Sequence, residues 1–356
     1  MRRSNKADAE LFIGTSGYSY PDWKGIVYPR TVKRDVGGST PELTYLSRYF
    51  NTCEINATFY RQFEPEIAKN WSDAVENPEF EFAIKANQVF THATGTKPRE
   101  RKAPTSVESL KYTRTDIDET RRFLDVLAER DRLLVVLFQF PVSFKFMSKD
   151  EKGEPVRLEG NWDHVADVLN AFKVYPMAIE FRHESWDDPW VLRALREHVT
   201  AWVNIDEPRL GASLHGTEYV TGPLAYLRLH GRNYKKWFNS KNRDERYDYL
   251  YTPEELEPIA KSLEAMAKKV EREPSRREVK KVIAATNNHY KGQAAVNAID
   301  LKRLLGVKNN PVPGELLKAY PQLGGDAAVE LPKRKTTSVS KAAPKQTRTG
   351  QSSLFG

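Results

Sequence analysis

Charged side chains stand where the apolar runs of this sequence end. The apolar run at residues 175–181 contains Glu180 as its last residue but one, and Arg182 follows two positions after this glutamate. Because side chains along a strand alternate between its two faces, Glu180 and Arg182 must point the same way and share one site. Ionisable side chains end three other runs, at Glu54, Asp206 and His230. The pattern predicts a catalytic cluster of these five residues, in which the two glutamates act as general acid and base.

A second set of side chains lies at or just beyond the same positions and is predicted to bind substrate. This set consists of Tyr18, Asn56, Tyr60, Lys85, Gln139, Trp186, Arg228 and Asn287. Its cations would hold an anionic or hydroxyl-rich group, and its rings would stack on a base or a sugar. Alternatively, the rings anchor loops, and Glu180 pairs with Arg182 or Arg228 in a structural ion network. We favour a functional role for the charged residues, because buried charges are costly unless they are paired. The number of charged side chains in this one layer exceeds what filling a core requires.

Histidines 92, 183, 230 and 289 also lie at or just after expected strand ends, where a multi-metal site would need several ligands to converge. No H-x-H or H-E-x-x-H spacing occurs, and Arg182 and Arg228 would crowd a cation. We therefore expect no cofactor and no metal ligand, with a divalent metal as the less favoured alternative.

The elements that must position these residues alternate regularly between strand and helix. Strands are expected at residues 11–18, 52–58, 81–86, 131–140, 175–181, 201–206, 224–231 and 280–288. Helices are expected at residues 41–50, 66–75, 116–130, 162–172, 189–198, 253–271 and 293–304. Eight strands in alternation with these helices predict an α/β fold, a (β/α)8 TIM-type barrel, whose active site lies at the carboxyl ends of its strands. An open doubly wound sheet is less favoured, because Gly14-Thr15-Ser16-Gly17 is not a G-x-G-x-x-G fingerprint.

Composition indicates a soluble globular protein and sets the expected domain limits. The 356 residues are 39% hydrophobic and 29% charged, with no apolar run of membrane-spanning length. We expect a cytoplasmic protein with no membrane partner. A single cysteine, Cys53, excludes an internal disulfide and is expected to fill the core. The expected divisions are a flexible N-terminus at 1–10, the barrel at 11–305, an extension at 306–332 and a disordered basic tail at 333–356.

The tail carries most of the net charge and a short motif. Six of the eight net positive charges lie between residues 333 and 348, where no acid occurs. Gln351, Leu354 and Phe355 resemble the Q-x-x-L-F peptide with which bacterial replication and repair proteins bind the sliding clamp. The peptide predicts the clamp as a partner, and the basic residues predict a salt-sensitive attraction to DNA.

Several motifs together resemble the YecE-like family, also known as domain of unknown function seventy-two. They are IGTSGY at 13–18, EINATFY at 54–60, FAIK at 82–85, QFP at 139–141, EFRHESW at 180–186, RLHG at 228–231 and NNHYKG at 287–292. The resemblance covers roughly residues 11–305. It implies a TIM-type barrel with a polar site at the strand ends, and it implies no particular reaction.

Three functions are consistent with these features. The preferred one is a hydrolase or lyase that acts on nucleic acid or a nucleotide-derived substrate and is recruited to the sliding clamp. A second is a small-molecule enzyme acting on a sugar or sugar phosphate, since the same acids and cations could perform that chemistry. A third is a non-catalytic, clamp-associated binding module. Fold alone cannot decide among them, because this barrel supports many chemistries.

Overall fold

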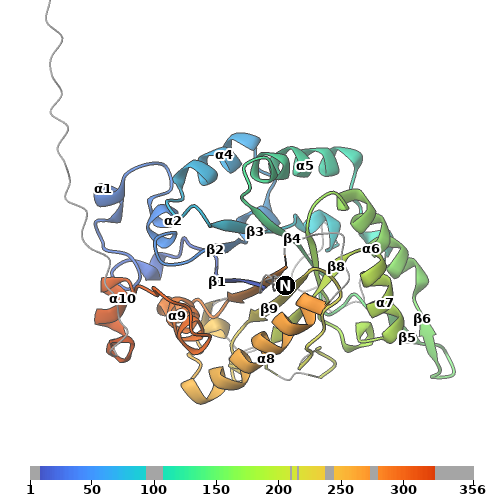
Figure 1. Cartoon of the computed structure of the whole chain (residues 1–356). Helices are drawn as coiled ribbons and strands as arrows, with labels where there is room; N and C mark the ends of the chain where they lie inside the picture. Colours follow the sequence, from blue (N-terminus) through green and yellow to red (C-terminus); the bar gives the residue numbers. More distant parts are fainter. Residues whose placement is uncertain are drawn as a thin grey trace, which may run out of the picture.

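Eight parallel strands close into a barrel with helices around it (Figure 1). The structure is a computed structural model, and it describes residues 9–93, 107–208, 211–214, 216–236, 244–272 and 280–324. The barrel strands are β1 (Glu10–Ser16), β2 (Thr52–Ile55), β3 (Glu81–Lys85), β4 (Leu133–Gln139), β7 (Met177–Glu180), β8 (Thr200–Asp206), β9 (Leu224–Leu229) and β10 (Lys281–Thr286). Their spatial order is β1-β10-β9-β8-β7-β4-β3-β2. The predicted TIM-type barrel is therefore confirmed.

The helices follow the strands as the alternation predicts. The main outer helices are α2 (Pro41–Leu46), α4 (Pro65–Ala74), α5 (Arg114–Ala128), α6 (Glu159–Phe172), α7 (Pro189–Glu197), α8 (Pro253–Arg272) and α9 (Gln293–Leu304). Shorter helices are α1 (Val32–Val36), α3 (Ala57–Tyr60) and α10 (Gly314–Ala319). Helix α5 begins two residues earlier than expected, because Thr113 and Asp116 form a capping box.

One local prediction is wrong. The strand expected at 52–58 ends at Ile55, and α3 follows because the Thr58 hydroxyl donates to the carbonyls of Ile55 and Lys85 and turns the chain. The segment between β4 and α6, for which no element was expected, contains an antiparallel hairpin of β5 (Met147–Lys149) and β6 (Pro155–Arg157). Its turn is held by Asp150, whose carboxylate accepts from the backbone amides of residues 152 and 154. Asp150 is a turn-forming residue that could have been recognised in the sequence as a signal for this turn.

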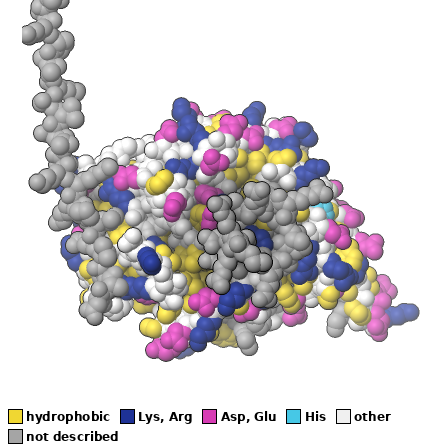
Figure 2. All heavy atoms as spheres, in the orientation of Figure 1, with side chains coloured by type: hydrophobic (Ala, Val, Ile, Leu, Met, Phe, Trp, Pro, Cys, Tyr) yellow, Lys and Arg dark blue, Asp and Glu magenta, His cyan; other side chains and the backbone are white. Residues whose placement is uncertain are grey.

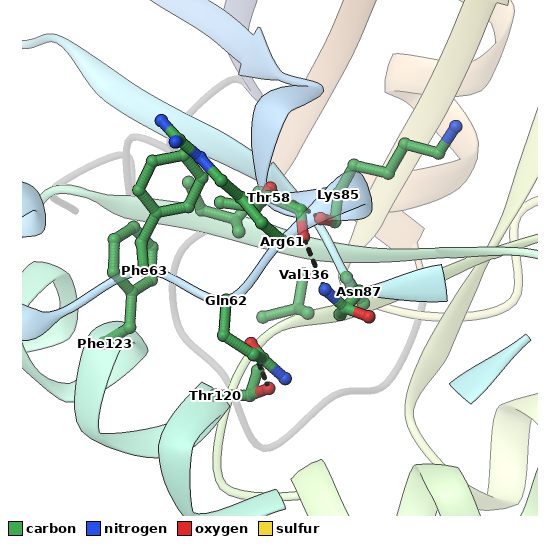
Figure 3. A pocket seen from close by; sticks show the side chains of 11 residues that line it. Thr58, Arg61, Gln62, Phe63, Lys85, Asn87, Thr120, Phe123 and Val136 are labelled. Carbon is green, nitrogen blue, oxygen red and sulfur yellow. Dashed lines mark hydrogen bonds between the residues drawn. The ribbon is translucent and has the colours of Figure 1, made fainter. Parts of the chain in front are cut away.

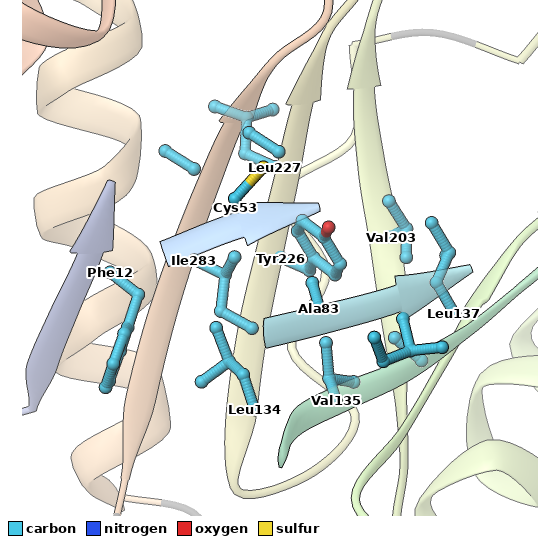
Figure 4. Packing of buried hydrophobic residues seen from close by; sticks show 14 of the residues in the cluster. Phe12, Cys53, Ala83, Leu134, Val135, Leu137, Val203, Tyr226, Leu227 and Ile283 are labelled. Atoms are coloured by element: carbon cyan, nitrogen blue, oxygen red, sulfur yellow. The ribbon is translucent and has the colours of Figure 1, made fainter. Parts of the chain in front are cut away.

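The barrel is packed with apolar side chains on both faces of its strands. Figure 4 shows Phe12, Val135, Val203 and Ile283 among them. Strand β4 is almost continuously buried, as expected of a parallel strand that is covered on both sides. Cys53 lies in this core, and burial raises the pKa of its thiol to about 12, which agrees with its predicted role as a filler.

The described surface mixes charges of both signs. Lys and Arg side chains are interspersed with Asp and Glu side chains over the face shown in Figure 2. Removing the six basic residues of 333–348 from the net charge of +8 leaves +2 for the rest of the chain. The body of the protein is thus close to electrically balanced.

An ion pair crosses the barrel interior at the amino ends of the strands. Lys281 at the start of β10 lies 2.6 Å from Glu81 at the start of β3, although β1 and β2 separate these strands in the sheet. The Lys281 ammonium also lies 5.0 Å from the centroid of the Phe12 ring. The pair joins opposite parts of the barrel wall.

We expect Lys281→Met to lower the free energy of unfolding by about 2 kcal/mol, because it leaves the Glu81 carboxylate without its cation in a mostly buried position. Adding Glu81→Gln should restore most of this loss. Urea denaturation measures both, and Lys318→Met, which removes an exposed pair with Glu315, is the control with an expected change below about 1 kcal/mol. A Lys281→Met effect no larger than the control would contradict the bridging role.

Candidate active site

Arg228 occupies the centre of the layer of polar side chains at the carboxyl ends of the strands. It lies on β9, is 1% exposed, and reaches Glu54 on β2 and Glu180 on β7. Its Nε donates to Glu54 Oε2 over 2.8 Å, Nη2 donates to Glu54 Oε1, and Nη1 donates to Glu180 Oε2. Tyr226, two residues earlier on the same face of β9, donates to Glu54 Oε2 over 2.6 Å, and the Ser16 hydroxyl donates to Oε1. Both oxygens of Glu54 are therefore occupied.

Arg182 extends the network toward the rim. Its guanidinium donates to Glu180 Oε1, to Glu207 Oε2 and, over 3.0 Å, to His230 Nε2. The prediction that Glu180 and Arg182 share one face is confirmed by this contact. Burial alone would raise the pKa of Glu180, but Arg182 and Arg228 outweigh burial and hold the pKa well below its usual range. Glu180 is thus an ionised carboxylate at any physiological pH.

His230 is a neutral acceptor for Arg182. Burial, followed by the charges of Arg182 and Arg228, lowers its pKa well below the usual value. A guanidinium can only donate, so Nε2 carries no proton and the single ring proton sits on Nδ1. Asn287 Nδ2 lies 2.9 Å from His230 Nδ1. With the proton on Nδ1, the Asn287 carboxamide has to be turned by 180° so that its oxygen accepts from that N–H, which frees the amide nitrogen as a donor.

Lys85 differs from the other cations of the layer. Its Nζ donates to Gln139 Oε1 over 2.7 Å and lies 4.0 Å from the centroid of the Phe59 ring, and it forms no ion pair with any described residue. Burial, followed by the charge of Arg228, lowers its pKa to about 7, against a smaller opposite effect of Glu180 and Glu54. A substantial fraction of the Lys85 amines is therefore uncharged at neutral pH.

Amides and rings stand around this amine. Asn56 follows β2 beside Lys85, since Ile55 and Ile84 are paired in the register, and its Nδ2 donates to Ser16 Oγ over 3.0 Å. Asn56 Oδ1 is buried without a hydrogen-bond partner among the described residues. The Phe59 ring packs edge to face with Tyr60, which is 49% exposed. These groups present hydrogen-bond donors, acceptors and flat apolar surface next to a reactive nitrogen.

Comparison with known proteins places this architecture in a family. The family model described as "Protein of unknown function DUF72" matches residues 12–322. The chain belongs to the DUF72 family. A DUF72 family protein from Thermotoga maritima is 32% identical, with a TM-score of 0.63, over 83% of this chain and 99% of that one. A DUF72 family protein from Enterococcus faecalis is 22% identical, with a TM-score of 0.61, over 84% of this chain and 96% of that one. No curated protein matches.

The resemblance read from the motifs is thus confirmed at the level of the family and its fold. The motifs at 54–60, 82–85, 180–186 and 228–231 of this DUF72 chain supply Glu54, Lys85, Glu180, Arg182, Arg228 and His230 to one layer. None of the described helices is long and apolar enough to cross a membrane.

Three residues predicted for the site lie elsewhere in the DUF72 structure. Asp206 pairs with Arg232 over 2.7 Å and accepts from Tyr251, on the helix-facing side of β8. Trp186 is fully buried, stacks on Phe181 with centroids 4.0 Å apart and donates to a backbone carbonyl. Both predictions are corrected by the packing: Asp206 holds a loop, and Trp186 belongs to the core.

Tyr18 is the third of these. Burial raises the pKa of its hydroxyl, which interacts with Trp71 of α4, so the side chain lies between the barrel and its outer helices. Asn56, Gln139 and Asn287, by contrast, contact members of the layer, and Tyr60 packs against Phe59. That these four bind substrate stays a prediction.

Three members of the layer escaped the sequence reasoning: Ser16, Tyr226 and Glu207. Strand alternation identifies Glu207 only once the phase of β8 is known. Asn204 bonds to Met266 on α8 and Asp206 faces the same way, so the next residue, Glu207, points inward. Tyr226 precedes Arg228 by two positions and follows the same rule.

Two cavities adjoin the layer, and they differ greatly in size. An open cleft of about 510 Å³ lies beyond β8 and is lined by Asp206, Glu207, Arg232 and Tyr234, among others. The cavity in Figure 3, of about 10 Å³, lies behind β3 and has room for one water next to the unpaired Nε2 of Gln62. The Lys85 amine points away from this smaller cavity (Figure 3).

Metal-ligating side chains do not gather in the described part of the DUF72 chain. No three His, Cys, Asp or Glu side chains there are placed to hold one ion. His183 bonds to Ser185, His230 to Arg182 and Asn287, and His289 stacks on Tyr20. These three histidines therefore make separate contacts, and His92 does not join them in a cluster that could hold one ion.

We expect Arg228→Met to lower the free energy of unfolding by about 3–5 kcal/mol, because it leaves the buried Glu54 carboxylate without a cation and the buried Glu180 carboxylate with Arg182 alone. Arg232→Met is the matched control: its guanidinium is 37% exposed, and its loss should cost about 1 kcal/mol or less. Chemical denaturation measures both.

If Arg228→Met does not fold, the triple variant Glu54→Gln, Arg228→Met, Glu180→Gln should recover folded protein, because it removes all three buried charges. Equal costs for Arg228→Met and Arg232→Met would show that the network contributes little to stability.

Proposed function

We propose that this DUF72 protein is an enzyme that acts on a small, hydroxyl-rich carbonyl compound such as a sugar, with Lys85 as its reactive group. The observation that carries the proposal is the Lys85 amine, which stands without an ion-pair partner among the described residues in a layer where the other cations are paired. A lysine with a lowered pKa at the carboxyl end of a barrel strand is suited to attack or deprotonate a substrate.

The charges of the layer favour a substrate without a large net charge. Glu54, Glu180 and Glu207 carry three negative charges, and Arg182 and Arg228 carry two positive charges that are already bound to them. Protonated Lys85 makes the total zero. The groups left for a substrate are the amides of Asn56, Gln139 and Asn287 and nearby aromatic rings, which match hydroxyl groups and sugar faces.

A hydrolase that uses Glu54 and Glu180 as acid and base has less support. Paired-carboxylate catalysis needs one carboxyl group that can be protonated and one with a free oxygen. Glu54 is bound at both oxygens and is 1% exposed, and Glu180 is held ionised by two guanidinium groups. We therefore assign proton transfer to Lys85 and the holding of Arg228 to the glutamates.

We expect the protein to catalyse exchange of hydrogen at the carbon next to the carbonyl of a sugar. The measurement is NMR of deuterium incorporation, in D2O, into a panel of aldoses, ketoses and their phosphates. The rate should rise as Lys85 loses its proton through about pH 7 and level off above that.

Lys85→Met should abolish the exchange. Lys302→Met is the matched control, because Lys302 is also buried, with a pKa lowered to about 8, but donates to the Tyr49 backbone carbonyl in the outer layer. Exchange that survives in Lys85→Met, or its absence with the whole panel, would refute the proposal.

We also propose that Gln351, Leu354 and Phe355 bind a bacterial sliding clamp. These residues lie outside the described part of the chain, and the proposal is supported by the Q-x-x-L-F pattern and by the six basic residues at 333–348. A short peptide of this kind raises the local concentration of the barrel near DNA without new contacts from the body.

For this second proposal we expect full-length protein to bind purified clamp in calorimetry, and Leu354→Ala, Phe355→Ala to lose the binding. Ser352→Ala, Ser353→Ala, at the variable positions of the pattern, should bind like the wild type. Equal binding by both variants, or none by the wild type, would remove the clamp from the partners of this protein.

A further inference from the structure

Lys85 is positioned as a nucleophile as well as a base. It ends β3, so its backbone is fixed by pairing with β2 and β4 and by the Thr58 hydroxyl on its carbonyl. The Gln139 carboxamide oxygen accepts one N–H and holds the amine against the Phe59 ring. In the neutral amine, the lone pair is then free to point at a bound substrate.

We infer that Lys85 attacks the carbonyl carbon of the substrate and forms a covalent imine with it. The inference rests on the proposed function and adds the chemical step. The nitrogen lone pair forms the C–N bond while the carbonyl π electrons move to oxygen. The two amine hydrogens then leave with that oxygen as water, and a C=N bond remains. Hydrolysis by water reverses the step, so no oxidant or reductant takes part.

The electrostatics of the layer support a cation at this nitrogen once the substrate has bound. Without a charge on Lys85, the three carboxylates and two guanidinium groups sum to one negative charge. The imine, once it has taken up one proton from water, carries a positive charge that restores neutrality and withdraws electrons from the neighbouring carbon, as a lyase or isomerase requires. Before substrate binds, a substantial fraction of the amine is uncharged and can attack at neutral pH.

The register also supplies an acceptor for the substrate beside the amine. Asn56 stands next to Lys85 across β2 and β3, and its buried Oδ1 has no partner among the described residues. This oxygen has no exposed surface, so a substrate reaches it only after the Asn56 carboxamide turns, and a hydroxyl group on the carbon next to the carbonyl would then satisfy it. The substrate class that we infer is an α-hydroxy aldehyde or ketone.

Lys302 shows the contrasting case of a buried lysine in a structural role. Its ammonium donates to the Tyr49 carbonyl over 2.7 Å and lies 5.6 Å from the Phe50 ring centroid, in the outer layer. Lys302 is as buried as Lys85. A comparison of the two lysines therefore separates the effect of burial on amine reactivity from the effect of a position at the carboxyl end of the barrel.

The test is reductive trapping with glycolaldehyde, the smallest α-hydroxy aldehyde, and cyanoborohydride near neutral pH. Peptide mass spectrometry of the full-length protein should find one hydroxyethyl group on Lys85 at reagent levels that leave other lysines unmodified. At neutral pH, Lys85 has about a thousandfold larger free-amine fraction than an ordinary surface lysine. Labelling should rise with pH through about 7.

Lys302→Met should leave this labelling unchanged, and D-fructose in excess should slow it. The mapping is done on the wild type, so it does not depend on the folding of a Lys85 variant. Labelling of Lys85 no faster than that of Lys302 or surface lysines would overturn the imine. If hydrogen exchange on sugars is nevertheless found, the proposed function stands with Lys85 as a base; if both experiments fail, the function falls as well.

Discussion

The buried Arg228 guanidinium is the interaction on which the carboxyl end of the barrel depends. It neutralises Glu54 and Glu180, which come from strands that are not neighbours of β9 or of each other in the sheet. A charge that loses its hydration on burial is costly, and the cost is offset only when partners and hydrogen bonds satisfy it fully. Each carboxylate oxygen of this trio has a donor. The pairing therefore fixes the positions of three strand ends at once.

The same pairing accounts for the chemistry left to Lys85. Arg228 and Arg182 occupy the glutamates that would otherwise hold an ammonium, and their positive charge opposes a further cation. From the sequence, these charged residues could form either a structural ion network or a catalytic cluster. In the structure, the two roles apply to different residues. Arg228, Glu54 and Glu180 brace the barrel, whereas burial, followed by the charge of Arg228, lowers the pKa of Lys85 and makes its amine reactive.

The rest of the fold holds this layer rigid. The interior below it is filled with apolar side chains and closed at the amino end by the Lys281–Glu81 pair. Above it, α3 places Phe59 against Lys85 and Tyr60 against Phe59, because the Thr58 hydroxyl ties the first turn after β2 to β3. A site built on strand ends and backed by a packed core keeps its distances without needing a ligand to order it.

The sequence by itself determined the eight alternating units, the polar strand ends and the common orientation of Glu180 and Arg182, because strand periodicity and apolar runs are local properties. Only the tertiary structure decided which polar residues enter the barrel. Asp206 and Glu207 differ by one position, and the phase of β8 turns the second inward. Whether Glu54 is free or bound depends on Arg228, 174 residues away along the chain. Contacts across a closed barrel are set by shear and packing, which no local pattern encodes.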